Sequence, residues 1–223
     1  MSASVAAPRT QMGFVGWATE AAIITAASLV TGLRVRWSGC APELKTRIYF
    51  ANHRSHADLP LIWAALPRDI RRTTRPVAGS DYWDKTAARR FIARSVFNCV
   101  LIDRNPKTRT ADPHALMEAV LSSGMSLILF PEGTRNMTDA PLLPFKSGIF
   151  HLALARPDVQ LVPVWIDNLN RVLPKGEFIP VPLLCEVRMG SPLGLLPNEE
   201  KPDFLVRIRE SLLALANAQA RQP

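Results

Sequence analysis

Short runs of β-favouring residues alternate with helical stretches along most of this chain, and this alternation limits the possible folds more than any other feature. Strands separated by helices need crossover connections, which produce a largely parallel sheet with helices packed on it. The candidate strands are Arg47–Ala51, Pro76–Gly79, Val100–Asp103, Ser126–Phe130, Gln160–Ile166 and Leu184–Met189. The candidate helices are Asp58–Ala65, Lys85–Ser95, Pro113–Ser123, Ser147–Ala155 and Pro202–Ala220. The pattern predicts an α/β fold in which a largely parallel central sheet is flanked by helices.

The length of 223 residues suits one domain of this class, because open α/β sheets commonly reach this size without splitting. We expect residues 41–223 to form that single α/β domain and residues 1–40 to form an apolar helical segment before it. The helix at Pro113–Ser123 has the clearest boundaries. Asp112 is suited to cap its first turn, and Gly124 suits the position just past its end.

The N-terminal stretch Met12–Leu33 is rich in apolar residues and resembles a membrane segment. Glu20 interrupts it, and the uninterrupted run Ala21–Leu33 has 13 residues. A helix needs about 20 apolar residues to cross a bilayer. We therefore predict a helix that does not span the membrane.

Two interpretations of this helix remain open. It either packs on the domain, or it lies at a lipid interface, where its apolar surface enters the headgroup region. In the second case Trp17 and Trp37 would lie at headgroup depth, and Arg34 and Arg36 would lie near anionic phosphates. The fold prediction therefore includes an N-terminal membrane-associated helix.

The chain carries 27 Lys and Arg against 19 Asp and Glu, which gives a net charge of +8 and favours anionic partners. Two clusters of arginine are either solvated or form a rim that docks on an anionic leaflet, at about 1 kcal/mol for each cation. They are Arg68, Arg71, Arg72 and Arg75, and Arg89, Arg90 and Arg94. With only two tyrosines, the sequence offers no aromatic and basic platform for nucleic acid. The three cysteines, at unrelated spacings, indicate neither a disulfide framework nor a zinc site, and fit a reducing, cytosol-facing location.

A polar cluster, NHRSHAD at residues 52–58, follows the first candidate strand. In open α/β sheets ligands bind beyond the carboxyl ends of the strands, so this is a place for functional side chains. His53 in the loop and Asp58 at the start of the helix could form a base whose ring is oriented by a carboxylate. Alternatively, Asp58 only caps the helix, or His53, His56 and Asp58 are metal ligands.

Two more clusters follow candidate strands. FPEGTR at residues 130–135 combines turn residues with Arg135, whose planar guanidinium matches phosphate oxygens, and FKSG at residues 145–148 opens the next helix. IDR at residues 102–104 again ends a strand with a cation. Taken alone, each cation also fits a solvated surface loop.

Together these blocks resemble the glycerol-phosphate and lysophospholipid acyltransferase family. NHRSHAD looks like its N-H-x-S-x-x-D block, and IDR and FPEGTR look like its second and third blocks. Val162-Pro163-Val164 matches the fourth block, a Val-Pro pair on an apolar strand. All four occur in the family's order.

The resemblance implies a role for each matching residue. His53 would be the general base and Asp58 would orient it. Arg104 and Arg135 would bind the acceptor's phosphate, with Lys146 as a further cation. Glu132 and Gly133 would shape the acceptor pocket and Thr134 would assist there. Asn52 and Ser55 would serve the geometry of the loop. The resemblance implies no metal and no tightly bound cofactor.

The implied reaction moves a fatty acyl group from acyl-coenzyme A or acyl carrier protein to a lysophospholipid, with 1-acyl-sn-glycerol-3-phosphate as the leading acceptor. The implied location is the cytoplasmic face of the inner (plasma) membrane. Many members carry a Lys-x-Glu-Leu stretch where this chain reads AGSDYW at residues 78–83, so other lyso-lipid acceptors remain open. The rival hypotheses are a metal-dependent lipid hydrolase and a membrane-binding module without catalysis.

Overall fold

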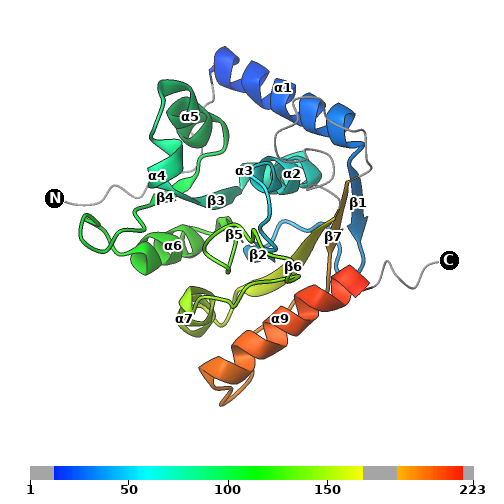
Figure 1. Cartoon of the computed structure of the whole chain (residues 1–223), viewed down its shortest axis with the longest axis vertical. Helices are drawn as coiled ribbons and strands as arrows, with labels where there is room; N and C mark the ends of the chain where they lie inside the picture. The colour runs from blue at the N-terminus through cyan, green and yellow to red at the C-terminus, as the bar shows by residue number, and fades with distance from the viewer. Residues whose placement is uncertain (1–12, 168–184, 218–223) are drawn as a thin grey trace.

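The structure is a computed structural model, and it describes residues 13–167 and 185–217. A seven-stranded sheet in the order β1-β7-β6-β2-β5-β3-β4 forms its centre (Figure 1). The neighbouring strands run parallel except for β6 and β7, which are antiparallel. The strands are β1 (Arg34–Trp37), β2 (Arg47–Ala51), β3 (Thr74–Gly79), β4 (Val100–Ile102), β5 (Ser126–Leu129), β6 (Gln160–Asp167) and β7 (Glu186–Met189). The predicted α/β fold with a largely parallel sheet is therefore confirmed.

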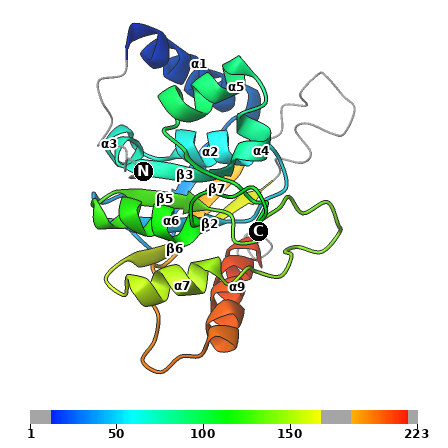
Figure 2. The ribbon, with the colours of Figure 1, turned by 90° about the vertical axis from the view of Figure 1, so that its left-hand side faces the viewer.

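Helices cover both faces of the sheet (Figure 2). One face carries α1 (Phe14–Thr31), α2 (Asp58–Ala65), α3 (Arg68–Arg72), α4 (Ser80–Trp83), α5 (Ala87–Phe91) and the π-helical turn η1 (Ile92–Val96). The other face carries α6 (Pro113–Ser122), α7 (Gly148–Ala155) and α9 (Lys201–Asn217).

Side chains of β2 alternate between the two layers. Tyr49 and Ala51 belong to the core under α2, whereas Ile48 and Phe50 belong to the core under α6, α7 and α9. All five residues of β2 are buried, as is usual for a central strand with helices on both faces. This strand is the rigid element from which the first polar cluster emerges.

Most predicted elements are present with small shifts at their ends. The helix predicted at Asp58–Ala65 has those bounds, and Asp112 caps α6 by accepting hydrogen bonds from the N–H groups of His114 and Ala115. The helix predicted at Lys85–Ser95 is instead α5 followed by the η1 turn, which ends at Val96. Met12, Leu184 and the end of the last predicted helix at residues 218–220 lie outside the described residues.

Three elements were not predicted: the edge strand β1 and the short helices α3 and α4. β1 pairs with β7, so the sheet begins before the expected domain start at residue 41. Within β1, Arg36 forms an ion pair with Glu186, and Trp37 is only partly exposed. The described structure thus places the Arg34–Trp37 stretch in the sheet and not in the N-terminal helix.

Helix α1 packs on α2 and η1. Glu20 lies on the buried side of α1. One of its carboxylate oxygens is 3.4 Å from Nη1 of Arg71 on α3, and this ion pair holds the helix on the domain. Phe14, Trp17 and Leu29 are exposed on its other side. The helix is long and apolar enough to cross a bilayer by length and composition alone, criteria that core helices and signal sequences also meet.

The parallel strands β2, β3, β4 and β5 all end at one edge of the sheet. The three polar clusters follow β2, β4 and β5, so the fold brings together segments that are far apart in sequence. This edge is where ligands bind in open α/β sheets.

Candidate active site

His53 and Asp58 form a dyad at the carboxyl end of β2. The Nδ1 atom of His53 lies 2.8 Å from Oδ2 of Asp58, which occupies the first position of α2 and is buried. The same oxygen accepts hydrogen bonds from the backbone N–H groups of Arg54 at 2.6 Å and Ser55 at 2.8 Å. A carboxylate in this position favours the proton on Nδ1 and leaves the Nε2 lone pair available to take a proton.

The plane of the His53 ring is fixed by Phe130, the residue directly after β5. The two rings stack with their centroids 4.2 Å apart and an interplanar angle of 22°. The imidazole is therefore held both at one edge, by Asp58, and on one face. Such restraint keeps a general base in the orientation that proton transfer needs.

Glu132 holds the backbone of His53 and does not line the cavity described below. One carboxylate oxygen accepts the His53 N–H at 2.8 Å, and the other accepts the Leu143 N–H at 2.8 Å. Burial raises the pKa of Glu132, and these two backbone hydrogen bonds act in the opposite direction. Asn136 adds a third link, because its N–H donates to the His53 carbonyl at 2.6 Å. Glu132 therefore shapes the pocket from behind, through the loop that carries His53.

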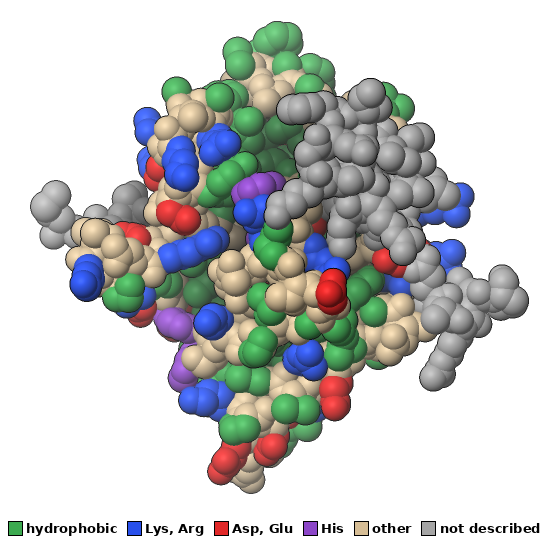
Figure 3. Space-filling model, in the orientation of Figure 1, with side chains coloured by type: hydrophobic (Ala, Val, Ile, Leu, Met, Phe, Trp, Pro, Cys, Tyr) green, Lys and Arg blue, Asp and Glu red, His purple; other side chains and the backbone are tan. Residues whose placement is uncertain are grey.

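The dyad opens on a cavity of about 850 Å³. In Figure 3 a histidine lies in the hollow, with Lys and Arg side chains around it. The lining contains two carboxylates, Asp81 and Asp103. It also contains six cations, which are Lys85, Arg89, Arg104, Arg109, Arg135 and Lys146. Such an excess of positive charge in a low-dielectric hollow attracts anions.

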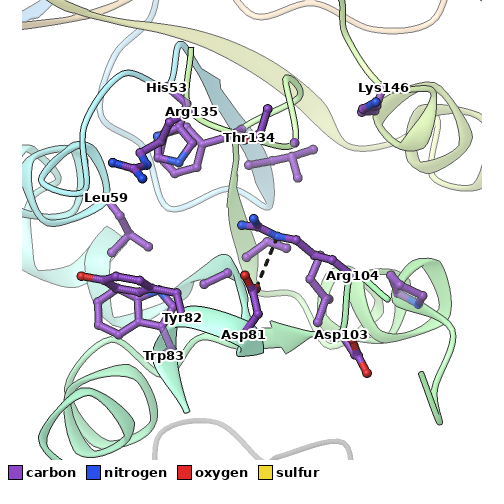
Figure 4. Close-up of a pocket in the computed structure, with 18 of the residues that line it drawn as sticks. His53, Leu59, Asp81, Tyr82, Trp83, Asp103, Arg104, Thr134, Arg135 and Lys146 are labelled. Carbon is purple, nitrogen blue, oxygen red and sulfur yellow. Dashed lines mark ion pairs between the residues drawn. The ribbon is translucent and has the colours of Figure 1, made fainter. Parts of the chain in front are cut away.

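The predicted phosphate-binding residues all line this cavity, together with His53, Gly133 and Thr134. In Figure 4 Arg135 lies beside His53, Lys146 lies on the far side, and the Arg104 guanidinium points into the space between them. Gly133 has φ of 71°, a left-handed conformation that favours glycine in this turn.

Arg104 rests over Gly79 and faces Asp81. Its Nε atom lies 3.7 Å from Oδ1 of Asp81 (Figure 4). A Cβ atom on Gly79 would collide with Oδ1 of Asp81 and would lie 2.6 Å from the same Nε, closer than atoms approach without bonding. The lack of a side chain at position 79 thus makes room for the guanidinium.

We did not predict from the sequence that Tyr82, Trp83 and His56 line the cavity on the side opposite Lys146; we call these residues the aromatic wall. Tyr82 stacks on His56 with centroids 4.4 Å apart, and the guanidinium carbon of Arg89 lies 4.3 Å from the centre of the same Tyr82 ring. Burial lowers the pKa of His56, and the charge of Arg135 lowers it further. The AGSDYW stretch at residues 78–83, which differs from the Lys-x-Glu-Leu of many family members, was the sequence feature that could have indicated this aromatic wall.

The remaining predicted positions have structural partners. Asn52 joins β2 to β6 by exchanging two hydrogen bonds with the backbone of Ile166, at 3.0 and 2.8 Å. Val162 and Val164 are fully buried in the core. In the described part of the chain, no group of three or more His, Cys, Asp or Glu side chains is arranged to hold a metal ion, so the metal hypothesis gains no support.

Comparison with known proteins adds independent information. Residues 34–167 match the family model described as "Acyltransferase". The chain is 31% identical over 195 residues to human 1-acyl-sn-glycerol-3-phosphate acyltransferase alpha, covering 82% of this chain and 64% of that protein. It is 29% identical over 167 residues to the 1-acyl-sn-glycerol-3-phosphate acyltransferase of Limnanthes douglasii, covering 74% of this chain and 56% of that protein.

A solved structure shares the fold. The 1-acyl-sn-glycerophosphate acyltransferase PlsC from Thermotoga maritima superposes with a TM-score of 0.72 at 22% identity, over 93% of this chain and 83% of that one. The chain thus spans less than two thirds of the length of the curated relatives it matches and most of the solved structure. With the family model matching more than half of its residues, the chain belongs to the acyltransferase family.

Proposed function

We propose that this protein transfers a fatty acyl group from a thioester donor to the hydroxyl of 1-acyl-sn-glycerol-3-phosphate, giving phosphatidate. The observation that carries the proposal is the His53–Asp58 dyad, held at 2.8 Å, on the wall of a cavity with six Lys and Arg side chains. The names of the relatives support the same acceptor.

In this reaction Nε2 of His53 takes the proton from the acceptor's hydroxyl as its oxygen attacks the thioester carbonyl carbon. Asp58 stabilises the imidazolium that forms. The tetrahedral intermediate then collapses: the carbon–sulfur bond breaks, the new ester remains, and the imidazolium returns its proton to the departing thiolate. The step needs neither a metal nor a redox cofactor.

The reaction also needs no acyl-enzyme, and the cysteines fit this role poorly. Burial raises the pKa of Cys99 to about 12 and that of Cys185 to about 11. The thiolate is the reactive form of cysteine, so both thiols are inert at neutral pH. None of the three cysteines lines the cavity.

The phosphate of the acceptor would bind Arg104, Arg135 and Lys146. Arg135 lies beside His53, which brings a charged headgroup close to the base (Figure 4). Guanidinium groups match phosphate oxygens in geometry and charge. Gly133 and Thr134, in the turn between these cations, would contact the glycerol portion of the lipid.

The lipid acceptor implies work at a membrane surface, and we place the protein at the cytoplasmic face of the inner membrane. The exposed apolar side of α1, with Phe14, Trp17 and Leu29, would enter the interface while Glu20 and Arg71 keep the helix on the domain. Arg71 and Arg75 are themselves buried, so they do not belong to a docking rim.

A panel of acceptors with the purified protein tests the proposal. We expect acyl-thioester cleavage with 1-acyl-sn-glycerol-3-phosphate, weaker transfer to lysophosphatidylcholine, and the weakest transfer to monoacylglycerol, which lacks a phosphate. Both acyl-coenzyme A and acyl carrier protein should be tried as donors. Equal rates with monoacylglycerol would contradict the phosphate role of the cations, and loss of activity after chelation would favour the hydrolase alternative.

A further inference from the structure

The six cations of the cavity fall into two groups, according to the face of the sheet from which they come. Arg104 and Arg109 follow β4, Arg135 follows β5, and Lys146 precedes α7. Lys85 and Arg89 come instead from the α4–α5 segment, on the face that carries α1 and α2. The proposed phosphate site of the acceptor uses Arg104, Arg135 and Lys146 of the first group, and the reaction as described so far uses neither Lys85 nor Arg89.

Arg89 is held at the cavity wall by an aromatic stack. Its guanidinium carbon lies 4.3 Å from the Tyr82 ring centre, while His56 stacks parallel to the same ring at 4.4 Å. Because the Arg89 guanidinium and the His56 ring both lie within 4.4 Å of the Tyr82 ring centre, they occupy opposite faces of that ring. A guanidinium stacked in this way keeps the N–H donors in its plane for a ligand.

Two neighbouring arginines share one carboxylate partner, whereas Arg89 has none among the described residues. Asp84 lies 3.4 Å from Arg90 Nε and 3.2 Å from Arg94 Nη2. For Lys85 and Arg89, by contrast, the described residues provide no carboxylate within ion-pair distance. The segment thus pairs its exposed Arg90 and Arg94 with Asp84, while Lys85 and Arg89, which line the cavity, are left to attract an anion.

Arg89 and Lys146 lie on opposite sides of the cavity. In Figure 4 Tyr82 and Trp83 lie across the cavity from Lys146. The guanidinium of Arg89 lies over the Tyr82 ring. Acyl transfer requires two anionic substrates near His53 at the same time. A second anion site on the Tyr82 side would let both bind without their charges meeting.

We propose that Lys85 and Arg89 bind the phosphate of the phosphopantetheine arm of the acyl donor, with the arm running along Tyr82 and Trp83 toward His53. The inference rests on the proposed function and names its donor chemistry. Coenzyme A and acyl carrier protein both present this phosphate, so the shared group is the ligand and the carrier is a separate question.

The test compares Arg89→Ala with Arg90→Ala, its neighbour on α5 that pairs with Asp84. With acyl-phosphopantetheine as donor, Arg89→Ala should raise the donor KM about tenfold, the effect of losing one charged hydrogen-bond partner. The KM for the acceptor and kcat at saturating donor should stay unchanged. Arg90→Ala should behave as the unmodified protein. With acyl-pantetheine, which lacks the phosphate, the two variants should be alike.

An equal rise in KM with acyl-pantetheine, or no difference between the two variants, would overturn the inference. Parallel measurements with acyl-coenzyme A and acyl carrier protein identify the carrier, because the natural one shows the same selective loss. If Arg89→Ala lowers the melting temperature, Lys85→Ala, at an exposed position, repeats the comparison. Absence of transfer by the unmodified protein from every donor would instead refute the proposed function.

Discussion

The two sides of the cavity are held in different ways. The catalytic side, residues 52–58 with 130–132, is fixed by buried hydrogen bonds to Asp58 and Glu132 and by the stack on Phe130. The anion side, residues 79–82 with 103–109, depends on the Asp81–Arg104 pair, whose side chains are 59% and 47% exposed and 3.7 Å apart. Exposed pairs of this kind contribute little to stability.

This difference corresponds to the two tasks proposed for the site, which are proton transfer and anion binding. In the proposed mechanism His53 is the base, and proton transfer tolerates little variation in the position of such a group. The several restraints on His53 suit that role. Anion binding depends on charge at longer range, and a guanidinium held loosely can adjust to its ligand. We therefore expect substitutions on the catalytic side to lower kcat or stability, and substitutions on the anion side to change KM.

His53→Ala is expected to have the largest effect. Loss of a general base typically lowers kcat by about 10²–10⁴-fold. The melting temperature should change little, because the restraints on the loop act on its backbone and on Asp58. Thiol release from the donor measures the rate, and circular dichroism checks the fold. Turnover equal to that of the unmodified protein would remove His53 from the mechanism.

Glu132→Gln should lower the free energy of unfolding, because it weakens the hydrogen bonds that hold the loop carrying His53. The carboxylate accepts two backbone N–H groups, whereas an amide offers one oxygen and turns an NH₂ group toward the other donor. One unsatisfied buried N–H costs about 1–3 kcal/mol. Urea unfolding should show this loss, and kcat should fall while the acceptor KM stays constant. Unchanged unfolding would mean that Glu132 does not hold the His53 loop.

The same contrast explains which parts of the site could be predicted. His53 and Asp58 are five residues apart, so a local strand-loop-helix pattern is enough to pair them. Arg104 and Arg135 could be placed because they follow strands whose carboxyl ends meet. The hydrogen bond from His53 N–H to Glu132 joins residues 79 positions apart, and no local pattern indicates it.

The missed elements have equally physical causes. β1 has the sequence RVRW, and its two arginines make it look unlike a strand. The segment is a strand because it pairs with β7 at the edge of the sheet. The expected continuous helix at Lys85–Ser95 becomes α5 and η1, since the change to π-helical hydrogen bonding near Ile92 depends on tertiary packing of Ala93 and Val96. Propensity alone does not encode either feature.

On the anion side, neighbouring substitutions should act in opposite directions. Gly79→Ala places a methyl group where the Asp81 carboxylate and the Arg104 guanidinium lie, which displaces both and should raise the acceptor KM several-fold. Asp81→Asn removes a negative charge that competes with phosphate for Arg104, so the acceptor KM should fall, because the exposed pair contributes little to orientation. Steady-state kinetics with varied acceptor measure both. A rise in KM for Asp81→Asn would show that Asp81 positions Arg104.

The smallest expected effect is a pH dependence of stability at His56, on the boundary of the two sides. The partial burial of its ring lowers its pKa in the folded protein, so the unfolded chain binds a proton at a higher pH than the native state does. Stability should therefore decrease as pH falls from the unfolded pKa, about 6.5, through the lower folded value. Because His56 is exposed to solvent, the loss should be only a few tenths of a kcal/mol. His56→Gln should flatten this part of the curve of urea midpoint against pH, while an unchanged slope would show that protonation of His56 does not oppose folding.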